Sequence, residues 1–126
     1  MGQTGKVTTL IVDDDEDIVE SLKELLSLYD FSILGSAQNG LEAVDLYNKL
    51  RPELVLLDVM MPVYDGIYAM EQIQKIDPNA NIIMITGDVR HETLEKLREA
   101  NISVLQKPFN VDQLVSLLKK TKKTKE

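Results

Sequence analysis

Cysteine is absent from this sequence. The protein therefore has no disulfide framework, no thiolate ligand for a metal ion and no thiol nucleophile. A chain without disulfides fits the reducing environment of the cytoplasm. Candidates for metal binding or chemistry must be sought among the oxygen and nitrogen side chains instead.

Long hydrophobic runs are absent as well. No run approaches the roughly 20 apolar residues that span a bilayer, and the N-terminal segment MGQTGKVTTL lacks the apolar stretch of a signal peptide. We therefore expect a cytoplasmic protein with no membrane association.

Two motifs in the N-terminal segment are misleading. GQTGKVT has too few residues between its glycines for a phosphate-binding loop, and Lys6 stands where a myristoylation site needs Ser or Thr.

Basic residues are scarce over most of the chain. The formal net charge is −7, and the last eight residues, KKTKKTKE, carry +4, so the preceding 118 residues carry −11. An acidic body argues against binding to a nucleic-acid backbone.

The length and composition suit a single domain. With 126 residues, 44% of them hydrophobic, the chain suits one globular domain over residues 1–126. We expect an ordered core over about 6–120 and a lysine-rich, solvated helix end at 119–126.

Short apolar runs alternate with longer amphipathic ones. The runs LVLL and IIMI show no polar alternation, which is typical of strands buried on both faces of a parallel sheet. Strands are predicted at 7–12, 31–37, 53–58, 81–86 and 102–106. Apolar residues at helical spacing predict a helix after each strand; the expected buried faces are Ile18, Leu22, Leu25 and Leu26; Leu41, Val44 and Tyr47; Ile67, Met70 and Ile73; Leu94 and Leu97; and Leu114, Val115 and Leu118. Asn110 and Gln113 predict a capping box at the last helix.

This strict alternation predicts a doubly wound α/β fold with five parallel strands and right-handed crossovers. In such folds, ligands bind at the carboxyl ends of the strands. Asp13 and Asp14 end the first predicted strand, Asp58 ends the third, Thr86 ends the fourth, and Lys107 follows the fifth. We therefore expect these five side chains to converge on one rim of the sheet.

The chemistry of this set points to a cation and a phosphoryl group. Clustered carboxylates repel one another unless a cation lies among them, and an all-oxygen set suits Mg²⁺ better than zinc. A carboxylate can also act as a nucleophile that forms an acyl phosphate, if a metal ion and an ammonium group neutralise the transferring group. Lys107 and Thr86 are the right residue types to hold phosphoryl oxygens.

Four motifs resemble the receiver domain of two-component response regulators: VDD at 12–14, DVMMPVYDG at 58–66, a strand that ends in Thr86, and KPF at 107–109. The resemblance spans residues 12–109. It implies a flavodoxin-like (βα)5 fold with strand order 2-1-3-4-5. It also implies a signalling domain rather than an enzyme, one that catalyses only its own phosphorylation and dephosphorylation. Its phosphodonor would be a sensor histidine kinase or a phosphotransfer protein.

The resemblance assigns roles to individual residues. It makes Asp58 the phosphoacceptor and places Mg²⁺ among Asp13, Asp14, Asp58 and the backbone carbonyl of Met60. It makes Thr86 the switch hydroxyl, whose movement would pull the Gly87–Asp88 loop.

The C-terminal part of the pattern is assigned in the same way. Lys107 would bind the phosphoryl group and precede a cis peptide bond to Pro108, and Asp65–Gly66 would form the turn that closes the loop after the phosphoacceptor. Since no output domain follows within these 126 residues, we expect a stand-alone receiver that acts on a separate protein through its fourth helix, fifth strand and fifth helix, unless the chain is a fragment of a longer regulator.

One departure from the receiver pattern affects signalling. Receivers often carry Tyr or Phe three residues before the lysine of KPF, where this chain has Val104. The preceding segment, EANISV, is one residue shorter than usual and has Asn101 where Gly is common. A movement coupled to Thr86 remains open, whereas readout by an aromatic side chain is not expected.

Other readings compete for some of these residues. Acidic residues 15–17 complement the positive end of a helix dipole and need no ligand. The spacing of Asp13, Asp15 and Asp17 with Glu24 mimics a calcium loop, but Ile18 stands where that loop needs glycine. His91, the single histidine, is expected on a solvated helix start. Two other functions stay open: a phosphorylation-independent binding module, and a phosphatase with an aspartate nucleophile, for which Met60 stands where a second acid is needed.

Overall fold

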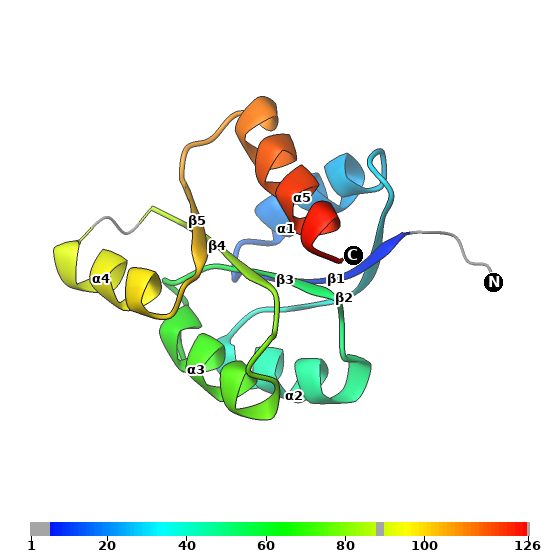
Figure 1. Ribbon diagram of the computed structural model, residues 1–126. Helices are drawn as coiled ribbons and strands as arrows, with labels where there is room; N and C mark the ends of the chain where they lie inside the picture. The colour runs from blue at the N-terminus through cyan, green and yellow to red at the C-terminus, as the bar shows by residue number, and fades with distance from the viewer. Residues whose placement is uncertain (1–5, 88–89, 126) are drawn as a thin grey trace.

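The computed structural model describes residues 6–87 and 90–125. Within these ranges, five strands and five helices alternate strictly (Figure 1). The strands are β1 (Val7–Val12), β2 (Phe31–Ala37), β3 (Leu54–Leu57), β4 (Ile82–Thr86) and β5 (Ser103–Gln106). The helices are α1 (Glu16–Leu26), α2 (Gly40–Leu50), α3 (Gly66–Ile76), α4 (His91–Glu99) and α5 (Val111–Lys125). The predicted alternation is confirmed, and the last helix extends into the lysine-rich segment, as far as Lys125.

All five strands are parallel, in the order β2-β1-β3-β4-β5. β1 pairs with both β2 and β3, so the direction in which strands are added reverses between β1 and β3. The sheet has α1 and α5 on one face and α2, α3 and α4 on the other (Figure 1). This is the flavodoxin-like arrangement that the receiver resemblance implied.

The two faces of the sheet bury separate hydrophobic clusters. In β3, Val55 and Leu57 pack with residues of α2, α3 and α4, whereas Leu54 and Leu56 pack with residues of α1 and α5. All four side chains are at most 1% exposed. Because successive side chains of a strand point to opposite faces, a strand covered on both sides is apolar at every position. This explains the absence of polar alternation in LVLL.

The acidic segment after β1 begins a helix, as predicted. Asp15 is the N-cap of α1, and its carboxylate accepts hydrogen bonds from the backbone N–H groups of Asp17 and Ile18 at 2.9 and 3.4 Å. Glu16 and Asp17 occupy the first turn, where negative charge complements the helix dipole.

Two other helix ends follow from local residue chemistry. Asn110 and Gln113 form the predicted capping box, in which each side chain accepts the other residue's N–H at 2.9 Å. After α4, Asn101 adopts the left-handed conformation (φ 63°), and Ile102 donates its N–H to Leu97 O. Asn tolerates this conformation better than other non-glycine residues, so it can replace the glycine common here in receivers.

The predicted buried face of α2 was partly wrong. Leu41 is 51% exposed, whereas Gly40, Ala43 and Tyr47 are buried. These three residues share one side of the helix at spacings of three and four, and two of them are small. The backbone of α2 therefore packs close to its neighbours, and the apolar periodicity alone does not reveal this.

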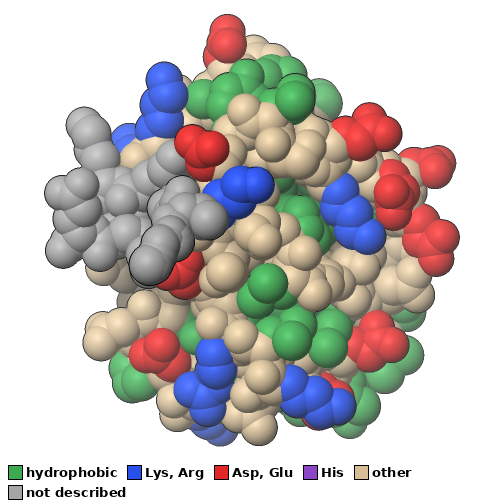
Figure 2. Space-filling model, turned by 90° about the vertical axis from the view of Figure 1, so that its right-hand side faces the viewer, with side chains coloured by type: hydrophobic (Ala, Val, Ile, Leu, Met, Phe, Trp, Pro, Cys, Tyr) green, Lys and Arg blue, Asp and Glu red, His purple; other side chains and the backbone are tan. Residues whose placement is uncertain are grey.

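Within the described chain, no helix combines the length and apolarity needed to cross a bilayer. On the visible part of the face in Figure 2, Lys and Arg side chains are dispersed among Asp and Glu side chains and small apolar groups. His91 begins α4, as expected, and its side chain is 85% exposed.

The N-cap role of Asp15 can be tested by substitution. Asp15→Ala removes both cap hydrogen bonds and is expected to lower the free energy of unfolding by about 1 kcal/mol, measured by urea denaturation. Asp15→Asn keeps a capping oxygen and loses only the charge, so it should retain most of the stability. Equal losses in the two variants would contradict the capping role.

Candidate functional site

Three carboxylates gather at the carboxyl end of the sheet. One carboxylate oxygen from each of Asp13, Asp14 and Asp58 can be chosen so that all three lie within 4.8 Å of one another. Asp13 and Asp58 are 3% and 6% exposed, whereas Asp14 is exposed. Asp13 and Asp58 follow paired strand ends, since Val12 pairs with Leu57. The reversal of strand order between β1 and β3 therefore creates the cluster.

Lys107 brings the last strand to the same site. Its Nζ lies 3.1 Å from Asp13 Oδ2 and 3.4 Å from Asp58 Oδ2. Its backbone N–H donates to Thr86 O at 2.8 Å, which ties the segment after β5 to the end of β4. The peptide bond between Lys107 and Pro108 is cis, as the receiver resemblance implied. Thr86 is fully buried.

The charges in this cluster are not balanced. Burial, and then the charge of Asp13, raise the pKa of Asp58 to about 6, although Lys107 and the Met60 N–H act in the opposite direction. Burial works to lower the pKa of Lys107, but its hydrogen bonds and the charges of Asp13 and Asp58 raise it overall. The ammonium group is thus held charged, yet it does not compensate both buried carboxylates. An added cation would remove this imbalance.

The loop after Asp58 passes close to its carboxylate. The Met60 N–H donates to Asp58 Oδ1 at 3.4 Å. Met60 itself is 58% exposed to solvent. Val63 and Tyr64 are also exposed, at 76% and 42%. The loop that follows Asp58 therefore presents three hydrophobic side chains to solvent.

The Asp65–Gly66 turn ends this loop, as predicted. Asp65 is the N-cap of α3 and accepts the Tyr68 N–H at 2.9 Å. Gly66 donates its N–H to Val59 O at 2.9 Å, and a Cβ at this position would overlap the Asp58 carbonyl group. Only glycine allows this approach, so Gly66 fixes the end of the loop against Asp58.

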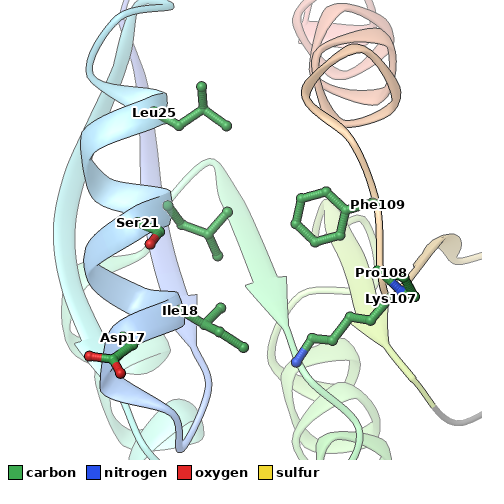
Figure 3. A pocket seen from close by; sticks show the side chains of 8 residues that line it. Asp17, Ile18, Ser21, Leu25, Lys107, Pro108 and Phe109 are labelled. Atoms are coloured by element: carbon green, nitrogen blue, oxygen red, sulfur yellow. The ribbon is translucent and has the colours of Figure 1, made fainter.

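An open apolar groove of about 530 Å³ lies next to Lys107. Figure 3 shows Ile18, Ser21 and Leu25 of α1 on one side. Pro108 and Phe109 lie on the other side, and Asp17 and Lys107 lie at one end. The sequence predicted Ile18 and Leu25 as part of a buried face, but both are only partly buried because this groove opens beside them. Lys107 thus belongs to both the acidic site and an accessible apolar surface.

Val104 occupies the half-buried position in β5 where receivers often carry an aromatic residue. It pairs with Met84 of β4 and packs at the margin of the cluster beneath α2, α3 and α4. Of the predicted site residues, Asp13, Asp14, Asp58 and Lys107 lie together at the cluster, and Met60 contacts it through its backbone N–H. Thr86 lies at the adjoining strand end.

The raised pKa of Asp58 predicts a pH dependence of stability in metal-free protein. Asp58 ionises near 3.8 in the unfolded chain and near 6 in the folded one. As pH rises from about 4 to about 6, the unfolded chain loses this proton first, so the free energy of unfolding falls across that window and does not recover above it. Asp58→Asn should reduce the fall, measured by urea denaturation in chelator. Glu71→Gln, an exposed carboxylate-to-amide change, is the control; an equal effect of both variants would contradict the assignment.

Comparisons with known proteins agree with this geometry. The family model of the response regulator receiver domain matches residues 9–119. The chain is 36% identical over 115 residues to the chemotaxis protein CheY of Thermotoga maritima, and the match covers 90% of this chain and 96% of that protein.

Solved structures show the same fold. A chain of the CheX–CheY–BeF3–Mg²⁺ complex from Borrelia burgdorferi matches with a TM-score of 0.83 and 28% identity, over 87% of this chain and 84% of that one. A CheY-like receiver domain protein from Methanospirillum hungatei matches with a TM-score of 0.88 and 26% identity, over 94% and 95% of the two chains. This chain therefore belongs to the response regulator receiver domains, a family of signalling phosphoacceptors rather than of catalytic enzymes.

Proposed function

We propose that this receiver domain accepts a phosphoryl group on Asp58, in a Mg²⁺-dependent reaction, from the phosphohistidine of a sensor histidine kinase or a phosphotransfer protein. The observation that carries the proposal is the surroundings of the Asp58 carboxylate. It lies in a three-carboxylate cluster and 3.4 Å from the Lys107 ammonium group. A nucleophile, a set of cation ligands and a phosphoryl-binding lysine thus occur at one place.

The donor set fits Mg²⁺. We assign the ion to Asp13, Asp14, Asp58 and the carbonyl oxygen of Met60, an all-oxygen set of the kind a hard cation prefers. Burial and the charge of Asp13 raise the pKa of Asp58 to about 6 even with Lys107 beside it, which supports a site for a divalent cation. When bound, Mg²⁺ supplies charge neutralisation at the phosphoryl oxygens.

In the transfer step, Asp58 acts as the nucleophile. A carboxylate oxygen forms a bond to phosphorus as the bond between phosphorus and the donor's imidazole nitrogen breaks, so an acyl phosphate forms and the histidine becomes neutral after protonation. Before transfer, the Lys107 ammonium group contacts Asp58 Oδ2. After transfer it would contact a phosphoryl oxygen, so it has a negatively charged partner in both states.

We further propose that Thr86 links phosphorylation to a change at the α4–β5–α5 surface. The Thr86 hydroxyl would bond a phosphoryl oxygen and draw the start of the next loop toward Asp58; Gly87 begins this loop, and Asp88 lies outside the described residues. The phosphoryl group would then favour a pre-existing active conformation. Val104 offers no aromatic ring for the readout, so the signal would pass through Thr86 and the neighbouring backbone to a protein target.

The phosphoacceptor role can be tested by intact mass measurement. Protein incubated with acetyl phosphate and Mg²⁺ is expected to gain one phosphoryl group, whereas omission of Mg²⁺ or the substitution Asp58→Asn should prevent the gain. Wild-type protein that never gains the group would contradict the proposal and favour the alternative, a phosphorylation-independent binding module of the same fold.

The assignment of Mg²⁺ ligands predicts that two neighbouring acidic residues after β1 have different roles: Asp14 binds the ion and Asp15 does not. Mg²⁺ at about 100 times its dissociation constant should raise the free energy of unfolding by about 2.7 kcal/mol. Asp14→Asn should abolish most of this gain because it replaces a charged carboxylate ligand of the ion with a neutral amide. Asp15→Asn is the matched control and should retain the gain because Asp15 caps α1. Equal stabilisation of the two variants by Mg²⁺ in denaturation measurements would contradict these separate roles.

A further inference from the structure

We propose that Gly40, the first residue of α2, is a positioning residue for the acidic site, because it clamps the loop that follows Asp58. This inference rests on the proposed phosphorylation of Asp58. Gly40 is buried and donates its N–H to the carbonyl oxygen of Tyr64, 24 residues further along the chain. Among the contacts of the described residues, Gly40 has none with the carboxylates or with Lys107, so its effect on the site must pass through the loop.

The contact requires glycine because the two backbones lie so close together. A Cβ at position 40 would lie 2.6 Å from the carbonyl oxygens of both Tyr64 and Asp65, a separation that real Cβ atoms essentially never show. The atoms it would meet belong to the backbone, so no side-chain rotation relieves the overlap. Any larger residue must therefore separate α2 from the loop.

The α2 side of this contact is held in place. The Asn39 side chain caps the helix by accepting the Glu42 N–H at 2.9 Å. The Gln38 N–H donates to Glu42 Oε1 at 2.9 Å, and Gln38 Nε2 donates to Glu16 Oε2 at 2.7 Å. The first two bonds fix the first turn of α2, and the third ties it to the start of α1. A Cβ at Gly40 would consequently displace the loop more readily than the helix.

The loop itself has little freedom to absorb such a shift. The Tyr64 N–H donates to Pro62 O at 2.9 Å, which closes a three-residue turn around Val63 with φ 72°. A β-branched residue with this φ is strained, and it persists because neighbouring contacts define the conformation. The Gly40 contact lies next to this turn and is one of those contacts.

A displacement of the loop would reach the reacting carboxylate. Met60 lies between the turn and Asp58, and its N–H donates to Asp58 Oδ1; its carbonyl oxygen is one of the proposed Mg²⁺ ligands. Gly66 holds the far end of the loop against Val59. With both ends held, a shift at Tyr64 changes the course of the residues between them, including Met60.

The first test compares phosphorylation rates with acetyl phosphate and Mg²⁺ by intact mass measurement. Gly40→Ala should lower the rate by about tenfold or more, since a misplacement of about 1 Å can cost on the order of 100-fold, while circular dichroism and the urea midpoint establish that it is folded. Gly35→Ala is the matched control because its Cβ would meet only Leu50, at an ordinary 3.5 Å. Adding Val63→Gly to Gly40→Ala should restore part of the rate, since glycine lets the loop follow without strain.

The second test uses wild-type protein and does not depend on folding of a variant. Gly40 begins α2, so its N–H has no partner within the helix, and its hydrogen exchange reports the bond to Tyr64. Exchange at Gly40, followed by NMR, should slow when Mg²⁺ is added, because ion binding and the clamp stabilise the same loop.

The outcomes separate the two proposals. Folded Gly40→Ala protein that is phosphorylated at the wild-type rate, or Gly40 exchange that Mg²⁺ leaves unchanged, would overturn the positioning role. Wild-type protein that gains no phosphoryl group would contradict the proposed function instead, and the exchange measurement with Mg²⁺ would still decide whether Gly40 clamps the loop.

Discussion

Two buried carboxylates sharing one ammonium group set the properties of this site. Asp13 and Asp58 are both buried, and Lys107 lies within 3.1 and 3.4 Å of them. One positive charge does not offset two negative charges in a poorly solvated place, so the site resists full ionisation. A cation or a phosphoryl group with its cation changes this balance, and Lys107 must respond because it pairs with both carboxylates. The electrostatics therefore couple segments that follow β1, β3 and β5.

The sheet makes this unfavourable arrangement possible. Asp58 directly follows a strand whose four residues are all buried, and its N–H donates to Val12 O of the neighbouring strand at 3.0 Å. Asp13 follows Val12 and donates its N–H to Ala37 O of β2 at 3.0 Å. The backbones that carry the two carboxylates therefore cannot separate without disturbing strand pairing and the core. The stability of the core thus holds the charged groups in a geometry that they would not adopt by themselves.

The sequence predicted those parts of the site that depend on residue type and order. Apolar runs located the strands, and the residues after them, such as Asp58 and Lys107, located the cluster, since parallel strands place their carboxyl ends together. The role of Gly40 was missed, and Leu41 was wrongly assigned to the buried face. Hydrophobic periodicity reports which side chains favour burial, but it does not report how closely two backbones approach. The left-handed turn at Val63 was also missed, because valine disfavours that conformation and is stabilised there only by tertiary contacts.

In the loop after Asp58, backbone contacts set the position of the chain, whereas exposed side chains set the chemistry of the surface. Its course depends on backbone contacts at Gly40 and Gly66 and on the turn at Val63, none of which involves the side chains of Met60 or Tyr64. Those two side chains, with that of Val63, are exposed beside the site. Exchanging the Met60 side chain for another would alter what a partner meets at the mouth of the site while leaving the backbone contacts at Gly40 and Gly66 in place. A receiver built in this way can keep one phosphorylation geometry and still present a distinct surface to its own partners.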